Sequence, residues 1–427
     1  MGTEAKRRHK SPVFYGWFIV AGHMAVHFYL GAVFIYGMSA FLGPMTSSMG
    51  WTRAQFSVAA GLQRLEGSVA SPVVGFIVDR FGPRRVILAG GVLATAGLLL
   101  MSQVHTLWAF YGAYVVVALG MSSTIGIPFT AAAVNWFSRR RGRAMGIMFS
   151  GPIVSGPVVP LLVVAIQAWG WRTAMAVVAL GTLLVVLPAG AAVRHRPEPY
   201  GYRPDNDDPP ADEPDRPGSG APPPTAVASL RVGEALSTRS FWVLTLIFGL
   251  TAMGPGAMFL HQIPYFESIG FSKATAATTF ATFSVLSGLG RLGAGWLMDY
   301  VDRRAVVAGL VLLNVLGFLV LAGTTAYWHT VVYALLFGTA FGGMIPARPI
   351  LTSALYGTRA FGAITGLMQS LAVVGGVAAP VVMGMVFDST GSYKPAILAI
   401  TALVALAIPL TALLPISKGA GARLART

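Results

Sequence analysis

The sequence predicts an all-α membrane protein in which twelve transmembrane helices form two bundles of six. The first observation behind this fold class is composition: 55% of the 427 residues are hydrophobic, only 11% are charged, and the mean hydropathy is +0.68. About a quarter of the residues of an ordinary soluble domain are charged. The second observation is a series of apolar runs, each near the length of about 20 residues that a helix needs to cross a bilayer. The third is a single polar segment in the middle of the chain.

Short clusters of glycine, proline, arginine and aspartate separate the apolar runs and mark the turns between the expected helices. The first run follows a basic N-terminal segment and is longer than the apolar core of a signal peptide, so we expect it to be retained as a transmembrane helix. The expected spans are residues 15–41, 54–78, 86–104, 107–134, 143–168, 173–193, 240–265, 274–298, 305–325, 329–355, 361–387 and 394–414.

The polar segment, residues 197–224, differs sharply in composition from the rest of the chain. It holds 10 of the 27 prolines and 7 of the 15 acidic residues. Such a segment cannot bury enough apolar surface to offset the entropy that it would lose on ordering. We therefore expect an N-terminal six-helix bundle over residues 1–195, a disordered cytoplasmic linker over 196–235 and a C-terminal six-helix bundle over 236–427.

The distribution of basic residues predicts the orientation of the chain in the membrane. With the N-terminus placed in the cytoplasm, 23 of the 30 lysines and arginines fall in cytoplasmic segments, four in the opposite loops and three within spans. This asymmetry follows the positive-inside rule. We therefore expect a multi-pass protein of the cytoplasmic membrane with both termini in the cytoplasm. The basic clusters then contact lipid headgroups, and the net charge of +15 predicts no nucleic-acid partner.

The two halves of the sequence repeat each other. GFIVDRFGPRR at residues 75–85 and GWLMDYVDRR at 295–304 each close the second span of their half with GxxxD and a pair of arginines. The turns MGWTRA at 49, WGWRTA at 169 and IGFSKA at 269 each place a glycine and an aromatic residue before an even-numbered span. Internal repetition of this kind is typical of transporters that work by alternating access.

The loop GxxxDRxGxRR after the second span resembles the signature loop of the major facilitator superfamily, and the plan of two halves covers essentially the whole chain. Two further stretches, YGWFIV in span one and NWFSRRRGRAMGIMFSG at 135–151, resemble the branch of monocarboxylate transporters and oxalate/formate antiporters. The resemblance implies the two-bundle fold of that superfamily and secondary active transport of a small organic anion. We expect a monocarboxylate such as lactate, pyruvate or formate, carried together with a proton.

Asp79 and Asp299 lie at the expected cytoplasmic ends of spans two and eight. There a carboxylate can accept hydrogen bonds from the backbone amides at the N-terminus of a neighbouring helix, or pair with a nearby arginine. Either contact would act as a conformational clasp that holds the halves together in one alternating state. Charge that only sets topology would explain the arginines equally well, but not the aspartates. The arginines of this expected clasp are Arg80, Arg84 and Arg303.

A charge inside a span costs about 2.5–3.5 kcal/mol on insertion scales and is a functional hypothesis by default. Arg291 lies eight residues before Asp299, or roughly 12 Å deeper at ~1.5 Å per residue. Its guanidinium can bind a carboxylate through two parallel hydrogen bonds. The resemblance implies that an arginine at this place in span eight binds the substrate carboxylate; the alternative is an ion pair with Glu66. The other charges well inside a span are those of Arg64 and Arg348.

Two departures from the resembling branch favour a substrate with one negative charge. The lysine that the oxalate/formate antiporter has in span eleven corresponds here to Met368, next to Gln369, and the lysine of mammalian-type carriers in span one corresponds to Tyr36. Arg348 supplies a second cation to the cavity or faces the headgroups; the sequence favours neither. We expect further substrate contacts, with ordinary helix packing as the alternative, from Tyr29, Tyr36, His261 and Gln369.

Glu66 is the one carboxylate well inside a span, and His27 lies at a similar expected depth on the adjacent helix. A carboxyl group in low dielectric and an imidazole can both exchange protons near neutral pH. We therefore expect Glu66 with His27 to couple proton movement to transport; the alternative is a static hydrogen-bonded pair. The i, i+4 spacing of His23 and His27 would suit a metal, but no third ligand supports one.

Residues 288–299, GLGRLGAGWLMD, contain the GxGxxG pattern of dinucleotide sites. That fingerprint requires a preceding strand, whereas these glycines lie in an apolar run and fit close helix packing in lipid. With no cysteine and no catalytic motif, the sequence predicts no enzyme, no cofactor and no metal site. We expect a monomer. Alternative functions are anion exchange, efflux of a larger amphipathic compound and a transport-inactive membrane sensor.

Overall fold

The computed structural model describes residues 13–35, 37–151, 159–206 and 230–415. These ranges are mostly helical and contain no β-strand, and helices occupy all twelve expected spans. Nine helices in this part of the chain are long and apolar enough to cross a membrane. The predicted fold class, an all-α membrane protein of two helical bundles, is confirmed.

The N-terminal half contains the first six spans, some of them broken into shorter helices. The first span passes from an α-helix through a π-helical turn into a second α-helix, and the fourth is divided in two. Helix α8 contains the end of the fifth span and the whole of the sixth, which meet at a non-helical Gly170. The elements are α1 (Gly16–Leu30), η1 (Gly31–Ile35), α2 (Met38–Met49), α3 (Arg53–Phe81), α4 (Pro83–Ser102), α5 (Leu107–Thr124), α6 (Ile127–Trp136), α7 (Arg141–Met148) and α8 (Val159–Ala192).

The C-terminal half repeats this order with longer, less interrupted helices. Between the halves lie two 3-10 turns, η4 (Glu198–Tyr200) and η5 (Pro204–Asn206), and the short helix α9 (Val232–Leu236). The six spans of the second half are α10 (Arg239–Ser268), α11 (Lys273–Tyr300), α12 (Arg303–Ala322), α13 (Tyr327–Tyr356), α14 (Phe361–Thr390), and α15 (Lys394–Ala405) with α16 (Ala407–Ala412).

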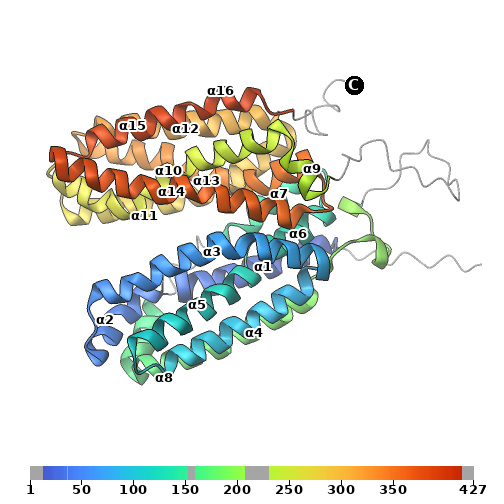
Figure 1. Ribbon diagram of the computed structural model, residues 1–427, viewed down its shortest axis with the longest axis horizontal. Coiled ribbons are helices and arrows are strands. Elements are labelled where there is room, and N and C mark those ends of the chain that lie inside the picture. The colour runs from blue at the N-terminus through green and yellow to red at the C-terminus, as the bar shows by residue number, and fades with distance from the viewer. Residues whose placement is uncertain (1–12, 36, 152–158, 207–229, 416–427) are drawn as a thin grey trace, which may run out of the picture.

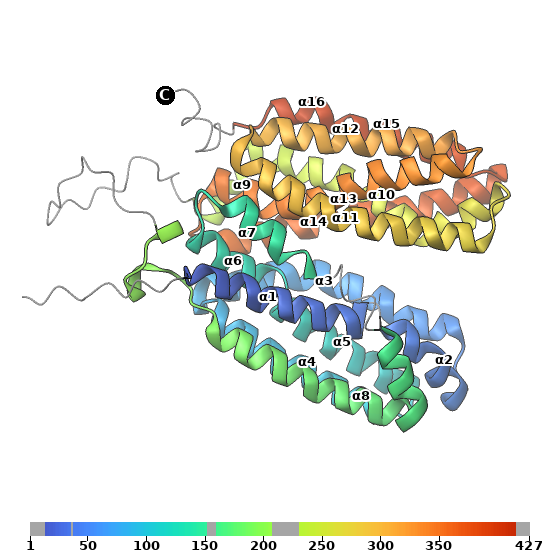
Figure 2. The same ribbon diagram turned by 180° about the vertical axis from the view of Figure 1, so that it is seen from behind.

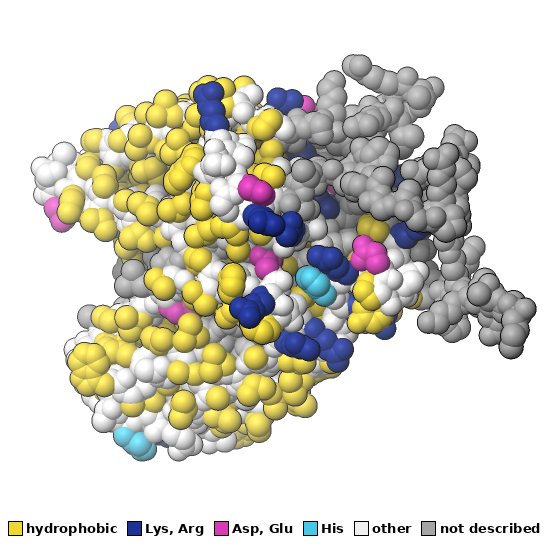
Figure 3. All heavy atoms as spheres, turned by 45° about the vertical axis from the view of Figure 1, so that its right-hand side comes forward, with side chains coloured by type: hydrophobic (Ala, Val, Ile, Leu, Met, Phe, Trp, Pro, Cys, Tyr) yellow, Lys and Arg dark blue, Asp and Glu magenta, His cyan; other side chains and the backbone are white. Residues whose placement is uncertain are grey.

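The two bundles lie side by side and are closest at one end of the molecule. Figure 1 shows the helices of the two halves meeting where α6, α7 and α9 lie, and diverging toward the end where α2 and the beginning of α11 lie. The view from behind shows the same arrangement (Figure 2). Basic side chains gather at the end where the bundles meet, and hydrophobic side chains cover much of the bundle surfaces (Figure 3).

Each of the three repeated turns contains a glycine with a positive φ angle. Gly50, Gly170 and Gly270 have φ angles of 68°, 77° and 92°, in the left-handed region that only glycine adopts without strain. After Gly50 and Gly270 the helices begin at N-caps, where Thr52 accepts a hydrogen bond from the amide of Gln55 and Ser272 one from the amide of Thr275. The sequence repeat therefore corresponds to a structural repeat at this end of the bundles.

The described beginning of the expected disordered linker has a defined place in the structure. Residues 198–206 form the turns η4 and η5, and Tyr202 packs against the rings of Phe14, Tyr15 and Trp136. A single aromatic side chain can bury apolar surface even in a proline-rich segment. A prediction based on the average composition of the segment does not take such a contact into account. Residues 207–229 lie outside the described ranges.

Glycines allow the halves to approach closely at two related places. A Cβ atom on Gly75 of α3 would lie 2.1 Å from the carbonyl oxygen of Gly362 in α14, and one on Gly295 of α11 would lie 2.4 Å from that of Gly142 in α7. Real side chains cannot approach a backbone oxygen so closely. The glycine of each GxxxD motif therefore serves contact between the halves.

We expect Gly295→Ala to weaken this contact. The added methyl must displace the backbone of α7, and overpacking of this kind typically costs about 1–3 kcal/mol. The result is a shift of about 5- to 150-fold toward conformations in which this end is open. Because the chain has no cysteine, spin labels at Arg85→Cys and Arg304→Cys can report the distance between the halves.

Gly293→Ala is the matched control, because a Cβ atom there has no neighbour within 4 Å. Equal distance distributions for Gly295→Ala and Gly293→Ala would contradict the assigned role of the contact.

Candidate functional site

Two aspartates bind helix N-termini across the boundary between the halves. Asp79 of α3 accepts hydrogen bonds from the amides of Gly362 (2.9 Å) and Ala363 (2.8 Å) at the start of α14. Asp299 of α11 accepts hydrogen bonds from the amides of Gly142 (2.6 Å) and Arg143 (2.9 Å) at the start of α7. A helix N-terminus has unpaired amides and a partial positive charge, which a carboxylate satisfies together. That these contacts act as a conformational clasp stays a prediction.

The loop before α7 is held by a third carboxylate. Asp205 of η5 accepts hydrogen bonds from the amides of Ser138 (2.7 Å), Arg139 (2.5 Å) and Arg140 (3.4 Å). It has a φ of 58°, which aspartate tolerates better than most residues, and it is buried. Asp205 and Asp299 together therefore accept hydrogen bonds from five amides between residues 138 and 143.

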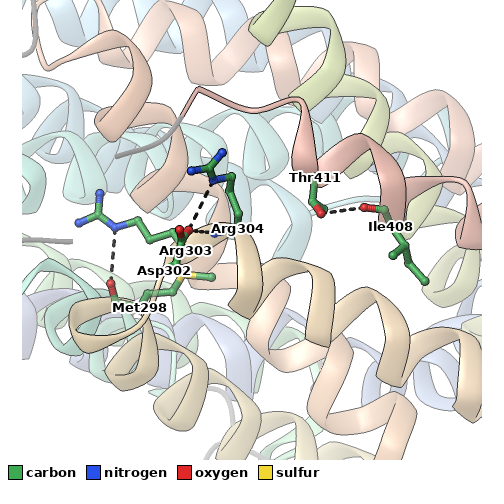
Figure 4. A network of polar contacts seen from close by, with 6 residues as sticks. All are labelled: Met298, Asp302, Arg303, Arg304, Ile408 and Thr411. Atoms are coloured by element: carbon green, nitrogen blue, oxygen red, sulfur yellow. Dashed lines mark hydrogen bonds and ion pairs between the residues drawn. The ribbon is translucent and has the colours of Figure 1, made fainter. Parts of the chain in front are cut away.

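Of the arginines expected in the clasp, Arg303 lies near enough to Asp299 for an electrostatic interaction, and neither Arg80 nor Arg84 has a described contact with either aspartate. Arg303 donates from Nε to the carbonyl of Met298 at 3.5 Å, while Asp302 caps α12 by accepting from the amide of Arg304 at 2.9 Å (Figure 4). The guanidinium of Arg80 lies 5.4 Å from the ring centre of Phe81. No contact is described for the side chain of Arg84, which is exposed.

A cavity of about 360 Å³ lies between the two halves. The C-terminal half supplies most of its wall, from α10, α13 and α14, and the N-terminal half supplies the start of α6 and the end of α7. The residues that line it are Gly126, Ile127, Thr130, Phe149, Phe248, Thr251, Ala252, Pro255, Phe341, Met344, Ile345, Arg348, Pro349, Thr365 and Gln369.

The break between α5 and α6 lies at this cavity. Gly126 has a φ of 84° and a ψ of −111°, a conformation that interrupts the helix and is open only to glycine. Irregular backbone at membrane depth is tolerated where it lines a cavity. Neither this break nor Thr130 was expected from the sequence, in which an isolated glycine within an apolar run is a weak signal.

Arg348 and Gln369 are the expected contact residues that the structure places on the cavity wall. Arg348 lies on α13 with its guanidinium carbon 4.9 Å from the ring centre of Phe248. It is the one charged residue among the described residues that line the cavity. Thr365 adds a buried hydroxyl that has no hydrogen-bond partner in the described part of the chain.

Arg291 is not among the described residues of the cavity wall. It joins the halves instead: Nη1 donates a 2.7 Å hydrogen bond to the carbonyl of Phe149, just past the end of α7, and Nη2 donates to Ser287 at 3.4 Å. The glycines around it fit helix packing, since a Cβ atom on Gly290 would meet the Thr339 carbonyl oxygen at 2.3 Å. The structure therefore places Arg291 next to the cavity, against the backbone of a residue that lines it.

Glu66 and His27, expected to lie together, have different neighbours. Glu66 of α3 accepts a 3.1 Å hydrogen bond from Ser122 of α5, and its other oxygen has no hydrogen-bond partner among the described residues. The ring of His27 lies 5.1 Å from that of His23 and 6.3 Å from that of Phe149. His23 in turn contacts the carbonyl of Met148 at 2.9 Å.

Two of the expected substrate contacts touch the backbone of their own halves. Tyr29 donates a 2.8 Å hydrogen bond to the carbonyl of Val178 in α8, and Nε2 of His261 lies 3.0 Å from the carbonyl oxygen of Pro380 in α14. Helix packing, the alternative for both side chains, accounts for these contacts, and their role in substrate binding stays a prediction. Tyr36 and the side chain of Arg64 lie outside the described residues.

A sequence profile of the Major Facilitator Superfamily matches residues 23–380 and 256–425. The chain belongs to the major facilitator superfamily. Among curated relatives, it is 27% identical over 418 residues to monocarboxylate transporter 12 of Rattus norvegicus, with 90% of this chain and 82% of the relative covered. It is 28% identical over 345 residues to monocarboxylate transporter 11 of Mus musculus, with 78% and 73% covered. These relatives are transporters rather than enzymes, and they support the monocarboxylate branch.

Solved structures of the superfamily show the same fold. The transporter FucP in its outward conformation superposes with a TM-score of 0.69 at 14% identity, over 94% of this chain and 100% of that chain. The human organic anion transporter MFSD10 superposes with a TM-score of 0.62 at 15% identity, over 93% and 97%. At such identities the likeness concerns the fold alone.

We expect Asp299→Asn and Asp205→Asn to loosen different parts of the same loop. Hydrogen bonds to a charged group contribute roughly 1.5–3 kcal/mol each, so each neutral substitution should speed exchange of the amides that its carboxylate holds. Hydrogen–deuterium exchange should rise at residues 142 and 143 in Asp299→Asn, and at residues 138–140 in Asp205→Asn. Unchanged exchange at the corresponding amides would refute the described contacts.

Proposed function

We propose that this protein is a secondary active transporter of a small organic anion with one carboxylate, driven by a proton and working by alternating access. The observation that supports it most is the cavity between the halves, whose described wall contains a single charged side chain, that of Arg348. A guanidinium matches a carboxylate through two parallel hydrogen bonds. The names of the monocarboxylate transporters among the relatives favour the same substrate class.

The contacts of Asp79 and Asp299 support a clasp that holds one alternating state. In this structure both carboxylates bind helix N-termini of the opposite half, and the halves diverge at the other end (Figure 1). The excess of basic residues in the segments at the closed end favours a cytoplasmic location for it. We therefore assign this structure to the outward-facing state of a monomer in the cytoplasmic membrane, with both termini in the cytoplasm.

Arg291 has a second role in this proposal. Its hydrogen bond to the carbonyl of Phe149 joins α11 to the segment after α7. The family resemblance favours Arg291 as the residue that binds the substrate carboxylate, but in the proposed outward-facing state its guanidinium donates to the backbone of Phe149. Reorientation of the halves would separate these two groups. Arg291 would then reach the substrate carboxylate only after that change, while Arg348 binds it first.

Glu66 is the proposed proton site. A charged carboxylate inside a bundle is costly unless its oxygens are paired, and the Oε1 atom of Glu66 has no hydrogen-bond partner among the described residues. Protonation removes the charge and converts the group into a donor. His27, which lies against Phe149 rather than Glu66, is a second candidate for the proton.

We expect Arg348→Met to weaken substrate binding by about 10- to 100-fold, since the lost charged hydrogen bonds contribute about 1.5–3 kcal/mol. Arg348→Lys should recover part of it, because an ammonium keeps the charge but not the fork of donors. The measurement is concentration-dependent uptake of labelled monocarboxylates, from formate to benzoate, into proteoliposomes. Arg359→Met, at an exposed arginine of the same half, is the control.

The same assay tests Arg291→Lys. A loss of affinity in Arg291→Lys alone would move the first carboxylate contact from Arg348 to Arg291. Unchanged affinity in both Arg348→Met and Arg291→Lys would contradict the proposed site.

Glu66→Gln is expected to abolish accumulation driven by a pH gradient, because an amide cannot take up and release the proton. Exchange of labelled for unlabelled substrate across the same liposomes should persist. The comparison of uptake with and without an imposed gradient measures the difference. A Glu66→Gln protein that still concentrates substrate in response to the gradient would exclude Glu66 as the proton site, and wild-type uptake that ignores the gradient would favour anion exchange.

A further inference from the structure

The wall of the central cavity is predominantly apolar. Three phenylalanines, Phe149, Phe248 and Phe341, come from both halves of the molecule. Ile127 and Met344 are among the aliphatic lining residues. Burying such a wall against an apolar or aromatic ligand surface lowers the free energy, whereas leaving it in contact with water does not.

The cavity is large for the smallest monocarboxylates. A volume of about 360 Å³ holds about twelve water molecules at roughly 30 Å³ each, and the same volume accommodates about as many non-hydrogen atoms of a ligand. Lactate and pyruvate have about half that number, and formate about a quarter. Each would leave much of the apolar wall facing water or empty space.

The polar groups of the wall favour one negative charge at one end of the ligand. Arg348 supplies a guanidinium, and both Thr365 and Gln369 lie on the neighbouring helix α14. The Thr365 hydroxyl is buried and has no hydrogen-bond partner among the described residues, so a ligand oxygen would complete its hydrogen bonding. The described wall offers no second cation for a dianion and no carboxylate for a cationic compound.

We propose that the site takes a monocarboxylate with an aromatic ring or an apolar group of similar size, such as 3-phenylpropionate, in preference to lactate, pyruvate or formate. The inference rests on the proposed transport of monocarboxylates and specifies the substrate within that class. The carboxylate binds Arg348, and the ring fills the space between the phenylalanines of the two halves.

Competition in proteoliposomes tests this preference with the full chain. Uptake of labelled 3-phenylpropionate is measured against unlabelled 3-phenylpropionate, lactate, pyruvate and formate. We expect the half-inhibitory concentration of 3-phenylpropionate to be at least about tenfold below that of lactate, since apolar groups that fill a hydrophobic pocket typically discriminate by 10- to 200-fold. The uncharged 3-phenylpropionamide should compete poorly, because it cannot form the charged pair with Arg348.

A cavity-narrowing substitution separates ring recognition from carboxylate recognition. Ala252→Leu adds volume to the wall on α10 and should lower the preference for 3-phenylpropionate over lactate by at least about tenfold. Ala96→Leu makes the same change on the exposed side of α4 and should leave the preference unchanged.

The outcomes distinguish this inference from the function on which it rests. Lactate or formate competing as well as 3-phenylpropionate would overturn the preference for a ring and leave monocarboxylate transport in place. An equal loss of preference in Ala96→Leu and Ala252→Leu would overturn the assignment to this cavity. If no carboxylate competes and a neutral or cationic aromatic compound is transported, both the inference and the proposed function fail.

Discussion

The hydrogen bonds from two helix N-termini to two aspartates join the halves of this protein at the end where they are closest. Asp79 binds the start of α14 and Asp299 the start of α7, so each half supplies one carboxylate and one helix end. The glycine four residues before each aspartate, Gly75 or Gly295, lets the partner helix come close enough to donate. In the GxxxD motif, the hydrogen bonds of the aspartate therefore depend on the glycine. A larger residue at the glycine would move the amides of the partner helix away from the carboxylate.

Helix α7 connects the contact at Asp299 with the cavity. Its first amides are held by Asp299, and the loop before it is held by Asp205 from the segment between the halves. Just beyond its other end, the carbonyl of Phe149 accepts a hydrogen bond from Arg291. A helix of eight residues spans only about 12 Å, so any movement at its start also displaces its end. The linker, the opposite half and the cavity thus contact a single short element.

Much of the fold could be predicted from the sequence, because apolar length and charge distribution are sufficient to locate transmembrane helices. The site was less predictable. The direction of a side chain depends on rotation about the helix axis, and in a helix that is apolar on every side no polar face reveals that rotation. Tyr29 and His261 accordingly contact carbonyl groups of their own halves, whereas Arg348, for which the sequence favoured neither position, lines the cavity. The break at Gly126 was also missed, since one glycine in an apolar run has no distinctive spacing.

Two of the three arginines inside the expected spans, Arg291 and Arg348, are connected through Phe149. Its ring lines the cavity that contains Arg348, and its carbonyl accepts the hydrogen bond from Arg291. A ligand that packs against this ring therefore contacts the residue that joins the halves at membrane depth. Coupling between binding and conformational change requires a ligand to interact differently with two states. In the proposed mechanism Phe149 is the place where such a difference arises, because its contact with Arg291 crosses the boundary between the halves.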